Sequence, residues 1–438
     1  MANDFLEDLQ QRGLVHQVSA PALADLLRQG PVVGYIGFDP TADSLHVGSL
    51  LPLLTLLRFQ RAGHRPIAVV GGGTGLIGDP SGKEDERVLL DRAQIEHNVA
   101  GIRAQIERLL DLGPGAGLLL NNAEWLEPLN LIEFLRDIGK HFSVNQMIMR
   151  DSVRMRLETR EHGLSYTEFS YMLLQAYDFL ALYDRYGCRL QMGGSDQWGN
   201  ILSGADLVRR LRGAEVYGLT LPLLTRADGK KFGKSEEGNV WLDARRTSPY
   251  QFYQFWLNTA DQDVVQYLRS FTLLSLEQID EAARAVATAP EQRDAQKLLA
   301  AEVTRLIHGP EALSRAQRAT AVLFSKEADF RQLSAQELRE AFHGAPSTRL
   351  EPQLLGTPAA NLVAVLADVG LYPSRGRARQ DVPAGAIAVN NRTIRDPNYV
   401  LSTADLLAGG FIILRKGKKH YHVLCAVGPE QATPSPTG

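Results

Sequence analysis

The feature that most constrains the fold of this chain is the alternation of strand-like and helix-like segments in its first half. Residues 32–38 and 67–70 are apolar runs typical of buried strands, and residues 50–60 between them form a densely apolar helical pattern that ends at Gly63. Asp91 begins a second helix, whose apolar residues recur at spacings of three and four. Because strands that alternate with helices form parallel sheets covered on both faces, the sequence predicts an α/β fold with a parallel sheet.

The second half of the chain changes character twice. Residues 249–324 carry helical patterns, and residues 325–358 are looser. Residues 359–428 mix a helical segment with short β-like runs. Residues 353–428 hold nine Lys or Arg against four Asp, a net charge of +5, whereas the whole chain carries −3. This region is therefore distinctly basic, and the polar tail over residues 429–438 predicts disorder.

The composition is ordinary for a globular protein, with 44% hydrophobic and 22% charged residues. Cys188 and Cys425 lie far apart without metal-type spacing, which favours free thiols in a reducing compartment and gives no sign of a protein metal site. The N-terminal sequence lacks an apolar signal core, and no stretch approaches the roughly 20 apolar residues of a membrane span. We therefore expect a cytoplasmic location and no membrane contact.

A glycine-rich stretch follows the second predicted strand and raises the question of a nucleotide site. It contains the pattern G-x-G-x-x-G at Gly73, Gly75 and Gly78. A dinucleotide-binding turn belongs to the first strand–helix connection and opens into a helix, whereas here the next helix waits until Asp91. A P-loop is excluded because Ile77 stands where it needs glycine and Glu84 where it needs Ser or Thr. Taken alone, the stretch fits a glycine-rich turn that packs a strand on a helix about as well as it fits another kind of binding site.

Two further segments are candidates for binding an anion. The segment HVGS, residues 46–49, stands at the mouth of the first predicted helix, where free backbone N–H groups and the helix dipole favour negative charge. The segment DGKKFGKSEEG, residues 228–238, places lysines on a glycine-punctuated loop suited to a mobile polyphosphate clamp. Taken alone, the first segment also fits a histidine that caps a helix, and the second fits a solvated basic loop.

One apolar helix carries a row of polar side chains. Tyr171, Gln175 and Asp178 are spaced i, i+4 and i+7, so they share one helix face. Because an unpaired buried polar group costs a few kcal/mol, these side chains must find partners. The pattern fits either a structural polar network or a ligand site.

Taken together, these segments resemble a known family. HVGS and KFGKS, about 185 residues apart, resemble the two signature motifs of class I aminoacyl-tRNA synthetases. The sequence around them closely resembles the bacterial tyrosyl-tRNA synthetases in GFDPTADSLHVG, GGGTGLIGDPSGK, GKHFSVNQM, FSYMLLQAYDF, GGSDQWGNI and RTSPYQFYQFW. SRGRARQDVPAGAIAVNN is similar to the S4-type RNA-binding fold of those enzymes. The resemblance covers nearly the whole chain apart from the extreme tail.

The resemblance implies a domain organisation. The expected parts follow one another along the chain: a Rossmann-like catalytic domain over residues 1–225, the KFGKS lysine loop and a linker over 226–248, an α-helical anticodon-side domain over 249–324, a linker over 325–358, a small α+β S4-like RNA-binding domain over 359–428, and a disordered tail over 429–438.

The activity that the resemblance implies is the ligation of tyrosine to tRNA. L-Tyrosine and ATP would form tyrosyl-adenylate and pyrophosphate by in-line attack of the carboxylate on the α-phosphorus, and tyrosine would then pass to the 3′ end of tRNA(Tyr) with release of AMP. The carboxylate is already ionised, so catalysis must come from positioning and from stabilising charge on the pyrophosphate. ATP is a substrate, Mg²⁺ is expected with it, and a homodimer is expected from the family alone.

The resemblance also assigns roles to residues at matching positions. The tyrosine-binding residues would be Asp79, Tyr171 and Gln175 on the α-ammonium, Tyr35 and Asp178 on the phenol, and Gln197. The ATP-binding residues would be Gly37, Asp39, Thr41, His46, Gly48, Gly194, Asp196 and Lys234. The residues that act in catalysis would be His46, Lys83, Arg87, Lys231, Lys234 and Ser235. The residues that face tRNA phosphates would be Arg375, Arg377, Arg379, Arg415, Lys416, Lys418 and Lys419.

The chain departs from the family pattern at both signature motifs. Ser49 replaces the second histidine of the first motif and is a shorter, weaker donor. Pro52 stands in the first turn of the predicted helix, where proline is tolerated, but it has no hydroxyl to reach ATP. Phe232 and Gly233 replace Met-Ser in the second motif, whose lysines remain.

Three other functions were weighed against this one. A tryptophanyl enzyme is disfavoured by Tyr35 and Asp178, which suit a phenol. An RNA-binding protein that has lost catalysis is disfavoured because the signature residues His46 and Asp196 and the loop lysines are intact. A small-molecule adenylating enzyme of the same superfamily would not need the basic C-terminal module.

Overall fold

The computed structural model describes residues 4–80, 90–150, 153–154, 165–227, 229, 232–235, 238–324, 329–417 and 420–426. The chain divides into two compact units. The sheet unit comprises Met1–Asp243 and Leu257–Val303, and the C-terminal unit comprises Ala244–Trp256 and Thr304–Gly438.

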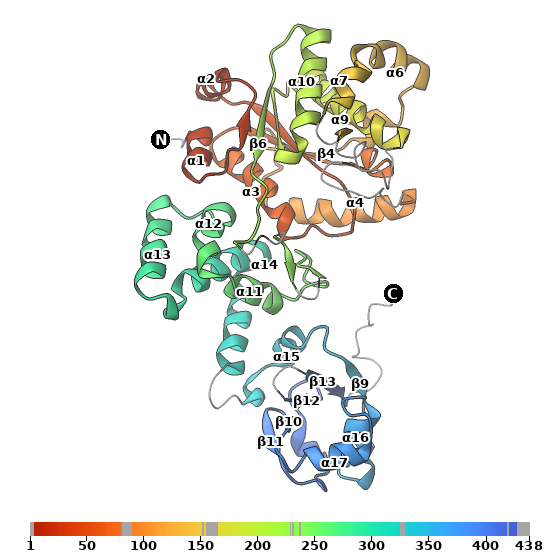
Figure 1. The fold of residues 1–438 in the computed structure, drawn as a ribbon, viewed down its shortest axis with the longest axis vertical. Helices are drawn as coiled ribbons and strands as arrows, with labels where there is room; N and C mark the ends of the chain where they lie inside the picture. The colour runs from red at the N-terminus through yellow and green to blue at the C-terminus, as the bar shows by residue number, and fades with distance from the viewer. Residues whose placement is uncertain are drawn as a thin grey trace. The chain divides into compact units, whose positions relative to one another are not determined.

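The sheet unit is built on a six-stranded sheet (Figure 1). In spatial order its strands are β1 (Gln17–Val18), β6 (Tyr217–Leu221), β5 (Leu190–Gly194), β2 (Val33–Phe38), β3 (Arg65–Val70) and β4 (Leu118–Asn121). Neighbours pair in parallel, except that β1 pairs antiparallel with β6 at one edge. The strand order reverses between β2 and β5, and ligands bind at such switch points, outside the carboxyl ends of the strands.

Helices connect the strands and cover both faces of this sheet. They are α1 (Phe5–Gln11), α2 (Ala22–Gln29), α3 (Val47–Arg61), α4 (Arg92–Ile106), α5 (Ala123–Leu126), α6 (Leu131–Asp137), α7 (Val144–Ile148), α9 (Tyr166–Tyr186) and α10 (Trp198–Arg212). Tyr35 packs with Phe179 of α9 and Leu207 of α10 in one core cluster. On the opposite face, Phe59 of α3 lies so close to Gly34 that an added Cβ would be 3.0 Å from its ring.

Local sequence signals set the limits of α9, the helix with the polar row. Ser165 and Glu168 form a reciprocal capping box at its start. Gly187 ends it with φ 64°, a left-handed conformation that glycine adopts without strain. These two signals give a helix of 21 residues, long enough to carry the whole polar row on one face.

The remaining elements of the sheet unit come from the lysine loop and from the chain that follows it. They are the two-stranded hairpin of β7 (Lys234–Ser235) and β8 (Gly238–Asn239), then α12 (Asp261–Phe271), α13 (Leu276–Thr288) and the first part of α14 (Asp294–Leu323). Arg58 of α3 ties α12 to the sheet, because its Nη2 donates to the carbonyls of Arg269, Ser270 and Thr272. Burial lowers the pKa of Arg58 to about 9.

The C-terminal unit contains most of α11 (Pro249–Leu257), the rest of α14, α15 (Ala335–Ala341), α16 (Leu362–Asp368) and α17 (Arg375–Asp381). Its five-stranded sheet has the order β11 (Arg392–Ile394), β10 (Ile387–Val389), β12 (Phe411–Lys416), β13 (His420–Cys425) and β9 (Ser347–Arg349). Residues of α16, α17, β10 and β12 share one hydrophobic cluster. α14 kinks at Gly309, where φ is 85° and Pro310 follows.

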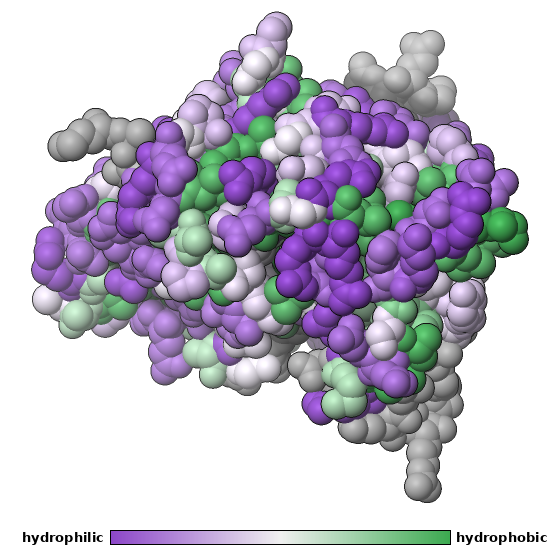
Figure 2. All heavy atoms as spheres, turned by 90° about the horizontal axis from the view of Figure 1, so that it is seen from above, coloured by the Kyte–Doolittle hydropathy of each residue, from purple (hydrophilic) through white to green (hydrophobic). Residues whose placement is uncertain are grey.

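An exposed apolar surface extends over α6, α7 and the start of α9. Its large hydrophobic side chains, which we call the 131–166 surface, are Leu131, Ile132, Leu135, Val144, Ile148, Met149 and Tyr166. Figure 2 looks onto the molecule from the top of Figure 1, the side on which α6, α7 and α10 are drawn, and shows hydrophobic patches among hydrophilic side chains. Exposed large apolar side chains that gather in one part of the chain are candidates for an interaction surface.

The predicted fold class is confirmed. A parallel-sheet unit with helices on both faces is followed in sequence by helices and by a small sheet domain. Cys188 and Cys425 are both free thiols, as the sequence predicted. Within the described ranges, no helix is both long and apolar enough to cross a membrane.

Candidate active site

A cavity of about 710 Å³ opens at the carboxyl ends of β2, β3, β5 and β6, at the switch point of the sheet. It collects most of the side chains that the sequence singled out. The predicted residues that line it are Tyr35, Gly37, Asp39, Thr41, His46, Gly48, Asp79, Tyr171, Gln175, Asp178, Gly194, Asp196 and Gln197. Residues that are far apart in sequence therefore meet in one site.

Asp178 of α9 is the most deeply buried carboxylate of the cavity, with 4% of its surface exposed. Its Oδ1 accepts a hydrogen bond from Trp125 Nε1 at 2.7 Å, and its Oδ2 accepts one from Asn122 Nδ2 at 3.1 Å. Burial raises the pKa of Asp178 to about 7, and the two donors oppose that rise because they stabilise the ionised form.

Two unpaired polar atoms lie in the same wall of the cavity. The Tyr35 hydroxyl and the Gln191 Oε1 are buried and have no hydrogen-bond partner among the residues that the structure describes. Burial, and secondly the charge of Asp178, raise the pKa of Tyr35 well above its ordinary value, so its hydroxyl stays neutral. Buried polar groups are normally paired, so this wall can accept a ligand that carries a hydroxyl.

A polar network connects the middle of the cavity. Asp39 accepts hydrogen bonds from Thr74 Oγ1 at 3.0 Å and from the Tyr171 hydroxyl at 2.9 Å. Asp79 Oδ2 accepts from Gln197 Nε2 at 2.7 Å. The two carboxylates stand among three neutral side chains, so this part of the cavity favours a cation.

The amide side chains of this network bind one another. Gln175 Nε2 donates to Gln197 Oε1 at 3.2 Å, and Asn200 Nδ2 donates to both Gln175 Oε1 at 2.8 Å and Gln197 Oε1 at 3.2 Å. The structural-network interpretation of the α9 row is therefore correct for Gln175. It does not exclude the ligand-site interpretation, because Tyr171, Gln175 and Asp178 all line the cavity.

His46 is the N-cap of α3, and its side chain explains the spacing H-x-G. His46 Nδ1 accepts from the Gly48 N–H at 2.9 Å. A Cβ at Gly48 would lie 2.6 Å from His46 Cε1, so the ring fits only against glycine. With Nδ1 as an acceptor, the neutral ring carries its proton on Nε2. His46 thus caps the helix through Nδ1, and the second ring nitrogen is a hydrogen-bond donor at the helix N-terminus.

The second signature segment packs directly on the first. The Val47 N–H donates to the Val240 carbonyl at 2.9 Å, and the Leu242 N–H donates to the Leu45 carbonyl at 2.8 Å. Gly233, with φ 95°, faces the Gly48 backbone, since an added Cβ would lie 3.5 Å from Gly48 N. Two motifs that are far apart in sequence are therefore backbone neighbours.

Phe232 holds the tip of the lysine loop against α12. Its ring is buried, stacks on Phe271 with centroids 5.0 Å apart, and meets Tyr267 edge-on at 4.9 Å. The backbone of Lys234 and Ser235 forms β7. Lys83, Arg87 and Lys231 lie outside the described residues.

The expectation for Pro52 was wrong. Because His46 caps α3, the helix begins at Val47, and Pro52 occupies the sixth helical position instead of the first turn. Proline has no N–H to donate to the Gly48 carbonyl, so the helix loses one bond there. Ser49 and Pro52 both line the cavity beside His46.

The predicted RNA-facing residues belong to the C-terminal unit. Arg375, Arg377 and Arg379 are exposed on α17. Arg415 and Lys416 lie on β12, where Lys416 Nζ donates to the Leu371 carbonyl at 2.8 Å and sits 4.0 Å from the Tyr372 ring centroid. Lys418 and Lys419 lie outside the described residues.

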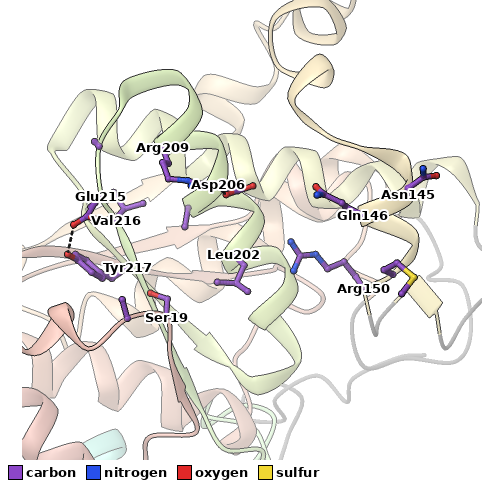
Figure 3. A pocket seen from close by; sticks show the side chains of 14 residues that line it. Ser19, Asn145, Gln146, Arg150, Leu202, Asp206, Arg209, Glu215, Val216 and Tyr217 are labelled. Atoms are coloured by element: carbon purple, nitrogen blue, oxygen red, sulfur yellow. Dashed lines mark hydrogen bonds and ion pairs between the residues drawn. The ribbon is translucent and has the colours of Figure 1, made fainter.

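A second cavity of the sheet unit, of about 780 Å³, lies between α7 and α10 and the β1–β6 edge (Figure 3). Arg150 extends toward α10, and Arg209 pairs with Asp206 at 2.5 Å. The two arginines are balanced by Asp206 and Glu215, so this cavity lacks the net positive charge that a polyphosphate site requires.

Comparisons with known proteins agree with this geometry. The family model described as tRNA synthetases class I (W and Y) matches residues 27–325, and that of the tyrosine–tRNA ligase SYY-like C-terminal domain matches residues 337–424. A tyrosine–tRNA ligase of Roseiflexus castenholzii is 52% identical over 422 residues, which cover 96% of this chain and 99% of the relative.

Solved structures show the same relationship. The C-terminally truncated mitochondrial tyrosyl-tRNA synthetase of Aspergillus nidulans is 32% identical with a TM-score of 0.66, and the match covers 74% of this chain and 94% of that one. The corresponding truncated enzyme of Coccidioides posadasii is 34% identical with a TM-score of 0.63, covering 72% and 91%.

The chain therefore belongs to the class I tRNA synthetases, in the family of the tryptophan and tyrosine enzymes. Within that family, a relative that matches almost the whole length of this chain is a tyrosine–tRNA ligase, which confirms the predicted resemblance.

Sequence reasoning missed four polar residues of the site. They are Asn122, Trp125, Gln191 and Asn200. Asn122 and Trp125 follow β4 at its carboxyl end, and Gln191 is a polar residue within an apolar strand. Both features are visible in the sequence, but neither indicates a ligand-binding role until the fold brings these residues to the cavity.

Proposed function

We propose that this protein activates L-tyrosine with ATP to form tyrosyl-adenylate and pyrophosphate, then transfers tyrosine to the 3′ end of tRNA(Tyr) and releases AMP. The observation that carries the proposal is the polar wall of the cavity, where Asp178 and the unpaired Tyr35 hydroxyl lie together among apolar residues. A tyrosine phenol would donate a hydrogen bond to Asp178 and accept one from the Tyr35 hydroxyl, so both groups would have a hydrogen-bond partner.

The α-ammonium of tyrosine would bind in the middle of the cavity. Support comes from the two carboxylates Asp39 and Asp79, and from the hydrogen bonds that orient Tyr171, Gln175 and Gln197 beside them. With the ammonium bound there, the amino-acid carboxylate would point toward the α3 N-terminus. The order phenol, ammonium, carboxylate then runs from the buried wall to the ATP end.

ATP would bind at the α3 N-terminus and at the ends of β2 and β5. Gly37, Asp39, Thr41, Gly48, Gly194 and Asp196 are assigned to it, with the His46 Nε2–H as a donor to a phosphate oxygen. The tyrosine carboxylate attacks the α-phosphorus in line, and the bond to pyrophosphate breaks. The carboxylate is already ionised, so the rate depends on alignment and on donors that stabilise the departing pyrophosphate.

Lys83, Arg87, Lys231, Lys234 and Ser235 are proposed as the clamp on that pyrophosphate. The proposal is supported by the backbone pairing of residues 240–242 with residues 45–47. This pairing brings the hairpin of β7 and β8, which we call the lysine hairpin, beside His46. Mg²⁺ would accompany ATP and offset phosphate charge. The described residues contain no group of three or more His, Cys, Asp or Glu that could hold a metal, so the ion would bind through the nucleotide.

We propose that the C-terminal unit contacts tRNA phosphates through Arg375, Arg377, Arg379, Arg415, Lys416, Lys418 and Lys419. Exposure of the three α17 arginines supports this role. Lys416 would contribute less, because its ammonium already binds the Leu371 carbonyl and the Tyr372 ring. Such contacts weaken as salt rises, since phosphate binding releases counterions.

We propose a homodimer that joins two copies through the 131–166 surface. Its seven side chains are most of the exposed large hydrophobic residues in the described part of the chain. Burying them against a second copy would remove apolar surface from water. A symmetric pair would cover the same residues on both copies. Sedimentation of wild type and of Ile132→Glu would show a dimer and a monomer, respectively. We further propose a cytoplasmic location, where tRNA is charged.

The decisive experiment is ATP–pyrophosphate exchange with the purified protein. Exchange should depend on tyrosine and should not respond to tryptophan or phenylalanine. A protein that exchanges equally with tryptophan, or that shows no exchange with tyrosine, would contradict the proposal. Transfer to tRNA(Tyr) would then be measured separately with labelled tyrosine, because the first step needs no RNA.

A further inference from the structure

A buried polar junction lies behind the ATP end of the cavity, where three segments of the sheet unit meet. Ser44 is at its centre with 4% of its surface exposed. Its Oγ donates to the Leu45 carbonyl at 2.8 Å and accepts from Gln105 Nε2 at 2.9 Å and from the Asp243 N–H at 3.2 Å. A hydroxyl has one donor and two acceptor positions, so Ser44 is fully satisfied.

Gln105 supplies the contacts from α4. Its Oε1 accepts from the Leu45 N–H at 2.9 Å while its Nε2 donates to Ser44. A single side chain thus fixes the two residues that come directly before His46. The orientation of the His46 ring and of the first N–H groups of α3 depends on where these two residues lie.

The same face of α4 supports the preceding part of the loop. Asn98 Nδ2 donates to the Pro40 carbonyl at 2.9 Å, and an added Cβ at Gly101 would lie 2.0 Å from the Asp43 carbonyl oxygen. Asn98, Gly101 and Gln105 are spaced i, i+3 and i+7, so they form one stripe along the helix. The stripe packs against residues 40–45 and fixes their backbone. This segment includes Thr41 and comes directly before His46.

The third segment is the chain that leaves the lysine hairpin. Residues 240 and 242 pair with Val47 and Leu45 through backbone hydrogen bonds, and the next bond in this ladder is the one from the Asp243 N–H to Ser44 Oγ. The hydroxyl of Ser44 therefore ends the ladder that joins the two signature segments. The junction links the position of the hairpin to that of the α3 N-terminus.

We propose that Gln105 and Ser44 are positioning residues, which hold the two signature segments in the register needed for adenylate formation. Neither residue lines the cavity, so neither contacts a substrate there. They act through the backbone of Leu45 and Asp243. A shift of about 1 Å between reacting groups can lower a rate about 100-fold, so a junction of this kind affects the rate from outside the site. The inference rests on the proposed activity.

The test is the variant Gln105→Met, which keeps the length of the side chain and removes both hydrogen bonds. We expect kcat of tyrosine-dependent exchange, normalised by active-site titration, to fall about 10- to 100-fold with a rise in KM for ATP. The dissociation constant of tyrosine alone should change less than about twofold, because the phenol wall is held by α9 and β2 instead. Ser44→Ala, a smaller change, should also lower kcat and raise KM for ATP, by smaller factors, and leave the dissociation constant of tyrosine nearly unchanged.

Gln60→Met is the matched control. Gln60 of α3 also makes two hydrogen bonds to a loop, since its Oε1 accepts from the Asp111 N–H at 2.9 Å and its Nε2 donates to the Asp111 carbonyl at 2.7 Å. It lies at the far end of α3 from His46. We expect a change in unfolding temperature similar to that of Gln105→Met, with kcat and KM for ATP as in wild type.

The outcomes separate this inference from the proposed activity. A wild-type protein without tyrosine-dependent exchange would overturn both. An active wild type with unchanged kcat and KM for ATP in Gln105→Met and Ser44→Ala would overturn the inference alone. A loss of tyrosine affinity equal to the loss for ATP would also overturn it, because that pattern reports a general structural defect.

Discussion

The indole Nε1–H of Trp125 donates to Oδ1 of Asp178 at 2.7 Å, and this bond favours the ionised form of the carboxylate that lines the cavity. Asp178 is buried, and burial alone favours its neutral form. The indole and the Asn122 amide each favour the carboxylate, which can accept a hydrogen bond from a phenol. Under the proposed assignment of Asp178 to the substrate phenol, selectivity for tyrosine would depend in part on residues that the ligand does not have to touch.

Trp125→Phe should weaken tyrosine binding about tenfold at pH 7, which is the loss of one hydrogen bond to a charged group. The pKa of Asp178 would rise further, so the deficit should be smaller at pH 9, where the carboxylate is ionised in both proteins. Equilibrium dialysis with labelled tyrosine at the two pH values measures this difference. An equal deficit at both pH values would show that the indole acts only by filling space.

Tyrosine binding should weaken as the pH falls below about 7. The pKa of Asp178 is raised to about 7, so its carboxylate is present above that pH and is lost as the pH falls through it. Because the phenol donates to the ionised form, the apparent dissociation constant should approach a tenfold increase per pH unit at low pH. Asp178→Asn is the control, since it should bind weakly with little pH dependence between 5 and 8. A flat wild-type profile would contradict this assignment.

His46→Asn should separate the two roles of His46. Asparagine is among the best N-cap residues, so the unfolding temperature should stay close to that of wild type. The Nε2 donor is lost, and kcat of exchange should fall about 100-fold. His46→Ala removes both functions and should also lose about 1 kcal/mol of stability. A near-normal rate in His46→Asn would mean that the side chain serves only as a cap.

Phe232→Ala should detach the lysine hairpin from α12. The ring packs on Tyr267 and Phe271, and without it the hairpin loses its apolar contact at that end. Exchange should slow at least about tenfold while tyrosine affinity stays the same, because local opening of a loop leaves the rest of the unit folded. Phe232→Leu keeps an apolar side chain and should recover most of the rate. Equal effects of the two substitutions would argue against packing as the cause.

Much of the sheet could be predicted from periodicity. The expected strands at 32–38 and 67–70 are β2 and β3, and Asp91 caps α4 as predicted, with its side chain accepting from the Gln94 N–H. The antiparallel β1 was not predicted, because a strand of two residues carries no periodic signal. The start of α3 was placed too late, since a histidine cap is not a common helix-start signal.

The site could be predicted only in part. Tyr171 and Asp178 were visible because the α9 pattern puts polar groups on an apolar helix. Trp125 and Gln191 were not, because their importance comes from contacts across the sheet that no local pattern encodes. The same holds for Gln105, which looks like an ordinary helix-surface residue until Ser44 and Leu45 are seen beside it.

The pairing of residues 45–47 with residues 240–242 has a consequence for the order of events during synthesis. The ATP end of the cavity needs both strands of this pairing, and almost 200 residues must be made between them. A nascent chain that ends before residue 242 can form α3 and β2 but cannot place the lysine hairpin beside His46. Contacts of such long sequence separation form late, so the growing chain would complete the proposed ATP end of the cavity only after more than half of it has been translated.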